Sequence, residues 1–425
     1  MTGLFAAQTA AVVGHILINI LIAHSGLGIV NALFVKCLIQ AEVAHNRVAF
    51  KRHQTDIEKY IRNFSSKGKI KKPLFNLAVV SVAHCAFQNR IAKESSVNAI
   101  VEYAKNKFGT SESRFINALL RKVCRENAVF HAHLPSDLQK RWRSEFGNDF
   151  IMQAEKCLSQ ESEQHFRLRK GFEIDGFQAE KIAPDLLSEF DFYKTCEIDK
   201  CLESKCFCDG GIYVQDAATG VAVEVLKKYV SRDKGRFIDV CGAPGGKAIM
   251  FHDLFPAWHI SIGDRSEKRH ERTKENLVRL KIDADLITCD ASSDKFKEKY
   301  DVLFADVPCS NSGVFRKRPD VLYRLNEKTL NEIVQIQCSI LDNVCDAVAD
   351  GGLLLYSTCS IESVEDTFQI KKFCQRHNEF ELLEERLTLP TLEHDGAYCA
   401  CLRRKTPICN EGNLLGTYRT LDQCN

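Results

Sequence analysis

Two cysteines in the second half of the chain are the residues best suited to chemistry. Cys309 ends the run Asp-Val-Pro-Cys, and Cys359 is the centre of the run Thr-Cys-Ser. Each run directly follows a short apolar segment, at 301–305 and 352–357, of the kind that forms a buried β-strand. Parallel strands of one sheet end at the same edge, so the sequence predicts that the two thiols lie close together.

Two thiols at one sheet edge suit methylation of carbon 5 of cytosine. That carbon is too weak a nucleophile to accept a methyl group until a nucleophile, such as a thiolate, has added at carbon 6. The site must also favour the thiolate, since an ordinary cysteine is only a few per cent ionised at pH 7. The hydrogen on carbon 5 must then leave, and a second group assists this elimination. An amino-group methyltransferase would instead carry an aromatic residue after the proline. The alternative is a pair of structural thiols in a chain with 19 cysteines.

A glycine-rich loop upstream is expected to bind the methyl donor. Its residues are Cys241, Gly242, Ala243, Pro244, Gly245, Gly246 and Lys247. Glycines let the backbone approach a ligand closely, and the start of the following helix offers free N–H groups to an anion. A P-loop needs glycine where Cys241 stands and Ser or Thr where Ala248 stands, and the dinucleotide spacing of glycines is also missing. S-adenosylmethionine, which offers a carboxylate, is therefore the expected cofactor.

Acidic residues follow the next two predicted strands. Asp264 is placed to accept protons from ribose hydroxyls, and Asp290 to accept from an adenine amino group. Acidic residues at strand ends are often only helix caps, so each signal alone is weak. Their succession along the sheet edge favours cofactor binding.

The elements that must position these residues alternate after Gly210. Such alternation predicts a mostly parallel sheet covered by helices on both faces. The expected strands are 236–240, 259–263, 284–288, 301–305 and 352–357, and the expected helices are 247–254, 267–280 and 327–349.

The earlier part of the chain is expected to be helical. Apolar residues recur at three-to-four spacing from about residue 31 to 130, with turn-like breaks at 65–68 and 109–111. Ser136 and Gln139 are typical of a capping box at the start of a further helix. The predicted regions are a helical domain (1–135), a mixed α/β connector (136–209), the catalytic domain (210–408) and a tail (409–425).

Charge is distributed unevenly along the chain. Residues 36–145 carry a net charge of +12 and the rest −10. A basic module on an acidic one favours binding to nucleic acid, although a solvated helical surface is the alternative. The segment 4–35 has no charged residue; a buried first helix is expected there rather than a membrane anchor.

The remaining cysteines favour a reducing compartment. No secretory signal is recognisable, so a cytoplasmic protein is expected, with no membrane partner and no oligomer. Cys196, Cys201, Cys206 and Cys208 cluster, but their spacing matches no zinc motif, so no metal is expected.

The motifs as they stand resemble the NOL1/NOP2/Sun family of RNA cytosine-5 methyltransferases. The resemblance rests on 237–247, 306–319 and 357–360, and on the entry segment 210–218. Segments 96–101 and 115–122 are similar to the RNA-binding helical domain of NusB. The combination implies a Rossmann-like methyltransferase domain with a seven-stranded sheet, preceded by an all-α NusB-like domain. It also implies a cytosine of small-subunit (16S) ribosomal RNA as the target.

The resemblance also implies roles for individual residues. Cys359 would be the nucleophile, and Cys309 would assist product release. The loop 241–247, with Asp264, Asp290 and Asp306, would contact S-adenosylmethionine, and Asp306 would also lie close to the target base. Gly242 departs from the alanine usual in the family, and we expect this difference to be harmless.

Several alternatives stay open. They are another RNA such as tRNA, a non-catalytic ribosome assembly factor, and DNA cytosine methylation, in which the cysteine after the proline attacks. Arg316, Lys317 and Arg318 are candidates to hold phosphates next to the target base, or are only a basic surface run.

Overall fold

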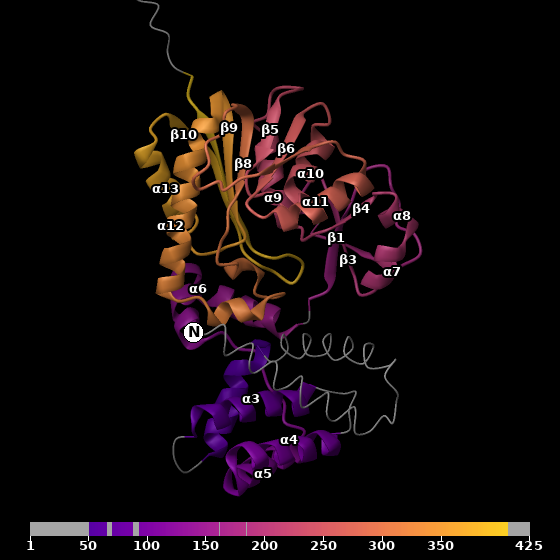
Figure 1. Ribbon diagram of the computed structural model, residues 1–425, viewed down its shortest axis with the longest axis vertical. Coiled ribbons are helices and arrows are strands. Elements are labelled where there is room, and N and C mark those ends of the chain that lie inside the picture. The colour runs from indigo at the N-terminus through magenta and orange to yellow at the C-terminus, as the bar shows by residue number, and fades with distance from the viewer. Residues whose placement is uncertain (1–50, 66–69, 88–92, 161, 184, 407–425) are drawn as a thin grey trace, which may run out of the picture. The chain divides into compact units, whose positions relative to one another are not determined.

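The computed structural model describes residues 51–65, 70–87, 93–160, 162–183 and 185–406 (Figure 1). The chain forms two compact units. One contains the chain up to Glu163 with Ser310–Leu330 and Leu389–Gly396, and the other contains Gln164–Cys309, Asn331–Thr388 and the chain from Ala397. The uncharged segment 4–35 and the tail 409–425 lie outside the described residues. The domain boundaries at 135, 209 and 408 stay predictions.

The first unit begins with helices, as the apolar spacing predicts. Residues 51–64 are helical, and α3 (Lys72–Phe87), α4 (Lys93–Phe108) and α5 (Thr110–Glu126) follow. Their apolar faces share one core, which includes Ile57, Val82, Ile100 and Leu119. Gly109 separates α4 from α5 with a φ of 107°, a conformation that glycine adopts without strain, which confirms the predicted break there.

The next helix, α6 (Ser136–Ser159), begins where expected but without a capping box. Pro135 is the N-cap residue, no side chain caps the helix, and the amide of Gln139 bonds to the carbonyl oxygen of Pro135 at 2.8 Å. The side chain of Gln139 donates to Glu155 instead, at 3.2 Å. The capping-box prediction is therefore wrong, because Ser136 is already inside the helix.

Two segments that are distant in sequence complete the first unit. Residues 310–330 contain η1 (Ser312–Val314) and η2 (Pro319–Tyr323). The Phe315 ring packs 5.6 Å from that of Trp142 on α6, and the Tyr323 hydroxyl lies 3.1 Å from that of Thr55. The residues that directly follow Cys309 in the chain thus pack within the first unit.

The second unit opens with a small antiparallel sheet of order β2-β3-β1-β4. Its strands are β1 (Gln164–Leu168), β2 (Glu180–Ile182), β3 (Asp191–Thr195) and β4 (Ile212–Val214), with α7 (Ile198–Glu203) and α8 (Lys205–Cys208) between β3 and β4. The buried guanidinium of Arg167 lies 2.6 Å from Asp253, and that of Arg169 lies 2.7 Å from it. Burial opposes ionisation of Asp253, but these two charges help to hold its pKa well below its ordinary value. The pairs attach the small sheet to the helix that carries Asp253.

The main sheet has seven strands in the order β10-β11-β9-β8-β5-β6-β7 (Figure 1). The five strands from β9 to β7 are parallel, and β11 and β10 add an antiparallel edge. The strands are β5 (Arg236–Asp239), β6 (His259–Asp264), β7 (Asp285–Thr288), β8 (Tyr300–Asp306), β9 (Val348–Thr358), β10 (Phe380–Thr388) and β11 (Ala397–Arg404). The five predicted strands and the mostly parallel sheet are confirmed, and β10 and β11 are two strands that the apolar pattern did not locate.

Helices cover both faces of this sheet, as expected for crossover connections. On one face lie α9 (Thr219–Lys227), α10 (Gly246–Leu254) and α11 (Glu267–Leu280), and on the other α12 (Glu327–Val344) and α13 (Thr367–Arg376). Alternate residues of β8 serve the two cores: Val302 and Phe304 belong to the first, Leu303 and Ala305 to the second.

One predicted helix is too long. The helix expected at 327–349 ends at Val344, η3 (Cys345–Ala347) follows, and β9 begins at Val348. The apolar spacing at the end of this segment suits a helix. Val348 nevertheless pairs with Tyr300 of β8, so these last residues belong to the sheet. Within the described ranges, no helix is both long enough and apolar enough to cross a membrane.

Candidate active site at the carboxyl edge of the sheet

The two predicted thiols meet. Cys309 follows β8 and Cys359 follows β9, and these strands are neighbours whose last paired residues are Asp306 and Ser357. The sulfur atoms lie 3.1 Å apart, and either thiol can donate a hydrogen bond to the other. Both side chains are half-buried and neither is in a disulfide, so each remains reachable by a substrate. The parallel pairing of β8 and β9 brings together two residues 50 positions apart.

The carboxylate of Asp306 is held between two donors at the same edge. Its Oδ2 lies 2.5 Å from the Nζ of Lys247 at the start of α10, and its Oδ1 accepts from the hydroxyl of Ser357 at 2.7 Å. Burial alone would lower the pKa of Lys247, but Asp306 and the nearby Asp239 outweigh burial and raise it, so the ammonium is kept. Lys247 and Asp306, both predicted, are in contact; Ser357 was not predicted as a site residue.

Asp239 is a second residue that the motifs did not single out. It ends β5, is 1% exposed, and accepts from the amide of Cys241 at 3.3 Å. Burial, followed by the charge of Asp306, raises its pKa to about 8. Its carboxyl group is therefore mostly protonated at neutral pH. Only the burial of the strand end by the surrounding fold reveals this, since a lone Asp in a strand carries no such signal.

Gly242 lies directly against the side chain of Asp239. A β-carbon at this position would lie 2.7 Å from Cγ and 2.9 Å from Cβ of Asp239, closer than non-bonded carbon atoms approach. An alanine could fit only if Asp239 moved. Glycine itself fits beside Asp239, so nothing in the structure contradicts the expectation that Gly242 is harmless here.

The rest of the loop has the shape expected for a close backbone approach. Gly245 has a φ of 98° and is the N-cap of α10, so Gly246 and Lys247 begin the helix and present its free amides. The carbonyl of Pro244 accepts from the hydroxyl of Tyr213 at 3.1 Å, which holds the loop against β4. Burial and three neighbouring aspartates raise the pKa of Cys241 well above its ordinary value, so this thiol is not a nucleophile.

Asp264 lies beside this loop, linked to it by an arginine. It is 2% exposed, and its Oδ1 accepts from the amide of Ser266 at 2.9 Å. Its Oδ2 lies 3.0 Å from Nη1 of Arg269, whose Nη2 donates to the carbonyl of Ala243 at 3.0 Å. Arg269 was not predicted; its position on the first turn of α11, five residues after Asp264, is the only sequence signal for it.

Asp290 follows β7 and is exposed. Its Oδ1 accepts from both the amide and the hydroxyl of Ser292, and these bonds lower its pKa. This local bonding is what a turn-capping carboxylate makes, so the geometry leaves open both roles considered from the sequence.

The four clustered cysteines do not form a common site. Cys201 and Cys206 are buried in a small apolar core, whereas Cys196 and Cys208 are exposed. Among the residues that the structure describes, no three His, Cys, Asp or Glu side chains are grouped to hold a metal ion.

The basic run after Cys309 is only partly available to phosphate. Arg316 is 3% exposed, and its guanidinium bonds to the carbonyls of Thr391 and Leu392. Lys317 lies 2.9 Å from Asp395, while the side chain of Arg318 is 53% exposed. The prediction that all three residues hold phosphates is therefore wrong for Arg316, whose charge serves the packing of its own unit.

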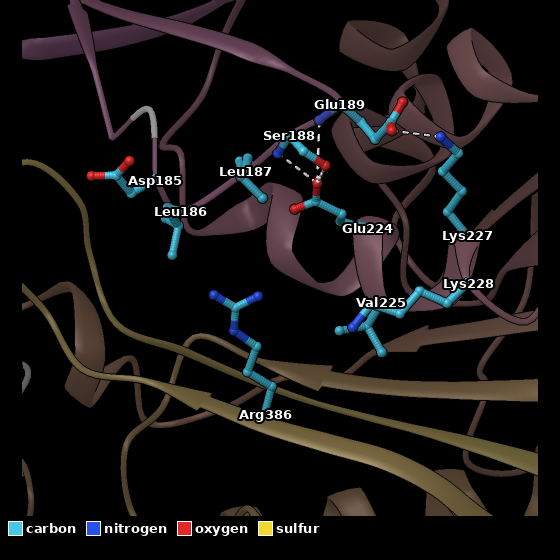
Figure 2. A pocket seen from close by; sticks show the side chains of 10 residues that line it. All are labelled: Asp185, Leu186, Leu187, Ser188, Glu189, Glu224, Val225, Lys227, Lys228 and Arg386. Carbon is cyan, nitrogen blue, oxygen red and sulfur yellow. Dashed lines mark hydrogen bonds and ion pairs between the residues drawn. The ribbon is translucent and has the colours of Figure 1, made fainter.

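The second unit also carries a hollow (Figure 2). It is lined by residues 185–189, by α9 and by Arg386 of β10, and Glu224 accepts hydrogen bonds from the amide and hydroxyl of Ser188 there. None of the predicted site residues lines it. The candidate site residues lie at the carboxyl edge of the sheet, and this pocket is lined by other residues.

The strand order and the helices on both faces define a Rossmann-like domain that follows a helical region. Residues 228–403 match the family described as 16S rRNA methyltransferase RsmB/F, and residues 47–125 match the NusB family. One part of the chain is thus similar to RsmB/F methyltransferases and another to the NusB family, which confirms the resemblance seen in the motifs.

Known proteins similar to this chain include the ribosomal RNA small subunit methyltransferase B of Yersinia enterocolitica, 34% identical over 207 residues. That match covers 46% of this chain and 48% of the relative, so the chain spans about half the length of the curated relatives it matches. The solved structure of PH0851 covers 93% of this chain and 98% of its own, with a TM-score of 0.67 and 21% identity. The match to the solved structure of NSun6 from Pyrococcus horikoshii covers 64% of this chain and 98% of that chain, with a TM-score of 0.54 and 18% identity. These two likenesses concern the fold.

Proposed function

We propose that this protein transfers a methyl group from S-adenosylmethionine to carbon 5 of a cytosine in small-subunit ribosomal RNA. The observation that carries the proposal is the 3.1 Å between the sulfur atoms of Cys309 and Cys359, within a region of RsmB/F type. One thiol can attack the pyrimidine while the other assists release, which is the division of labour that this reaction needs. A structural pair of thiols would not need to be half-exposed at the ligand-binding edge of the sheet.

In the proposed mechanism, Cys359 is the nucleophile. Its thiolate forms a bond with carbon 6 of the cytosine, which gives carbon 5 the electron density to accept a methyl group. Cys309 then assists removal of the proton on carbon 5, and the bond between Cys359 and carbon 6 breaks to release the product. Asp306, held by Lys247 and Ser357, is the polar group proposed to face the base.

The residues present fit the expected cofactor. The amides at the start of α10 suit its carboxylate, Asp264 suits the ribose hydroxyls, and Asp290 suits the adenine amino group. The loop Cys241–Lys247 would form the floor of the site. When bound, S-adenosylmethionine supplies a methyl group on a sulfonium centre, a strong electrophile that needs no metal.

Ribosomal RNA is the proposed substrate because of the relatives and the charge. The relative in Yersinia enterocolitica is named for the small ribosomal subunit, and the NusB-type region coincides with the basic part of the chain. To reach a stacked base, the enzyme would need an unpaired nucleotide or would have to extrude it, at about a few kcal/mol. Methylation of another RNA such as tRNA, and a non-catalytic assembly role, are the alternatives. A cytoplasmic location and a monomeric state stay predictions.

Methyl transfer from labelled S-adenosylmethionine to naked 16S RNA tests the proposal. The wild-type chain should transfer label to cytosine carbon 5. Cys359→Ala should give neither transfer nor a covalent RNA adduct, whereas Cys309→Ala should accumulate the adduct because release fails. Cys208→Ala, an exposed thiol outside the site, is the control and should behave as wild type.

Two results would contradict the proposal. If Cys309→Ala abolishes the adduct while Cys359→Ala retains it, the two roles are reversed, as in DNA cytosine methylation. If the chain binds the cofactor but labels no RNA, it is an assembly factor. Mapping 5-methylcytosine in ribosomal and transfer RNA, with and without the protein, distinguishes the substrates.

A further inference from the structure

We propose that Gln337 is a positioning residue that sets the place of Cys309 relative to Cys359. This inference rests on the proposed function for its catalytic consequence, but its geometric part does not. Gln337 lies on α12, between β8 and β9 in sequence, and its side chain is fully buried. It belongs to none of the motifs that identify the site.

One amide group links the two cysteine loops. The Nε2 of Gln337 donates to the carbonyl oxygen of Pro308, the residue before Cys309, at 3.0 Å. The same nitrogen donates to Oε2 of Glu365 at 3.0 Å. The other carboxylate oxygen of Glu365 accepts from the hydroxyl of Ser360, the residue after Cys359, at 2.8 Å. A chain of three hydrogen bonds therefore runs from the backbone beside one thiol to the loop beside the other.

The orientation of this amide has only one solution. Both of its neighbours, a carbonyl and a carboxylate, are acceptors, so the NH2 group must face them. The Oε1 of Gln337 is buried and has no hydrogen-bond partner among the described residues. The hydrogen bonds that Gln337 makes are therefore those of its NH2 group.

The two loops do not depend on Gln337 equally. The Cys359 loop keeps other buried bonds without it: the hydroxyl of Thr358 donates to Asp366 at 2.7 Å, and Ser360 still donates to Glu365. The bond from Gln337 to Pro308 is a direct tether on the backbone next to Cys309. Loss of the amide is therefore expected to displace Cys309 more than Cys359.

This asymmetry predicts a specific kinetic defect. In Gln337→Met, which keeps the volume but loses both donors, attack by Cys359 should proceed within about threefold of the wild-type rate. Release should slow by about tenfold or more, since a displacement of about 1 Å in a catalytic group can cost up to a hundredfold in rate. The covalent RNA adduct should then accumulate, as in Cys309→Ala but less completely. Glu365→Gln keeps an acceptor for Gln337 and should release product at nearly the wild-type rate.

The experiment measures two quantities on the full chain. The first is the rate at which the oxidant diamide links Cys309 to Cys359 in the free protein, read by peptide mapping. The second is adduct formation and release in a single turnover with 16S RNA. The matched control is Gln369→Met, because Gln369 is 1% exposed and also donates to a carbonyl of α12, that of Val334, at 2.9 Å.

Gln337→Met should slow disulfide formation by about tenfold and slow release, and Gln369→Met should do neither. Equal effects of the two variants on all steps, or wild-type behaviour of Gln337→Met, would overturn the proposal. If the methionine variant does not fold, Gln337→Leu, which also removes the amide, is measured in the same way. A failure of the proposed function looks different: Cys309→Ala would trap no adduct, while disulfide formation would still respond to Gln337.

Discussion

The Nζ of Lys247 lies 2.5 Å from Oδ2 of Asp306, so an ion pair joins the first turn of the cofactor-loop helix to the end of the strand that leads to Cys309. This ion pair therefore connects the loop proposed to bind the cofactor with the strand end proposed to face the base. Asp239 also lies close enough to influence Lys247, although its own carboxyl group is mostly protonated at neutral pH.

Replacement of this lysine should be costly. Lys247→Met leaves the carboxylate of Asp306 without its cation, and breaking a largely buried pair costs about 3–5 kcal/mol. We expect a lower melting temperature and a methyl-transfer rate reduced by about a hundredfold. Lys227→Met is the control, because Lys227 makes an exposed pair with Glu189 that should contribute no more than about 1 kcal/mol. A Lys247→Met enzyme with wild-type turnover would show that the pair is not part of the mechanism.

The buried carboxyl of Asp239 should make stability depend on pH. Its pKa is raised to about 8, so the folded state holds a proton that the unfolded chain releases above its ordinary pKa near 4. The stability that this proton contributes is complete below about pH 4 and is lost as pH rises through 8. Between pH 4 and pH 8 the free energy of unfolding that this proton contributes falls by about 1.4 kcal/mol per pH unit.

Asp239→Asn removes this dependence. Urea unfolding of both proteins at pH 5, 6.5 and 8 should show the variant gaining on the wild type as pH rises. Fluorescence of Trp258, measured in a Trp142→Phe background, reports the unit that contains the sheet, since the chain has only these two tryptophans. A difference in unfolding free energy that stays constant from pH 5 to pH 8 would mean that Asp239 is ionised throughout.

The contacts of Asp264 predict how the cofactor is held. Asp264→Ala should weaken binding of S-adenosylhomocysteine, measured by titration calorimetry, by about ten- to a hundredfold, the effect of losing hydrogen bonds to a charged group. Arg269→Gln should weaken it less, by about two- to fivefold, because Asp264 keeps the amide of Ser266. Asp285→Ala, which removes an exposed carboxylate from the neighbouring strand, is the control. Unchanged affinity in Asp264→Ala would place the ribose elsewhere.

Much of the site was predictable because its signals are local. The thiols, the glycine loop and the acidic residues each stand directly after an apolar run, and the carboxyl ends of parallel strands meet at one edge whatever the details of packing. The five parallel strands were predictable for the same reason: a strand buried on both faces is a continuous apolar run. The antiparallel β10 is half-exposed and alternates weakly, so its pattern was not distinctive.

What the sequence by itself determined is the set of candidate residues: which thiols, which loop, and the strands that carry them to one sheet edge. Only the tertiary structure decided the couplings between them. Burial raises the pKa of Asp239, and Gly242 lies against that side chain. Arg316 is buried within its own unit. Gln337, on a helix outside the motifs, links the two cysteine loops. The physical reason is that strand formation depends mainly on residues that are neighbours in sequence. Burial, steric contact and hydrogen-bond partners depend instead on residues that folding brings together from distant positions.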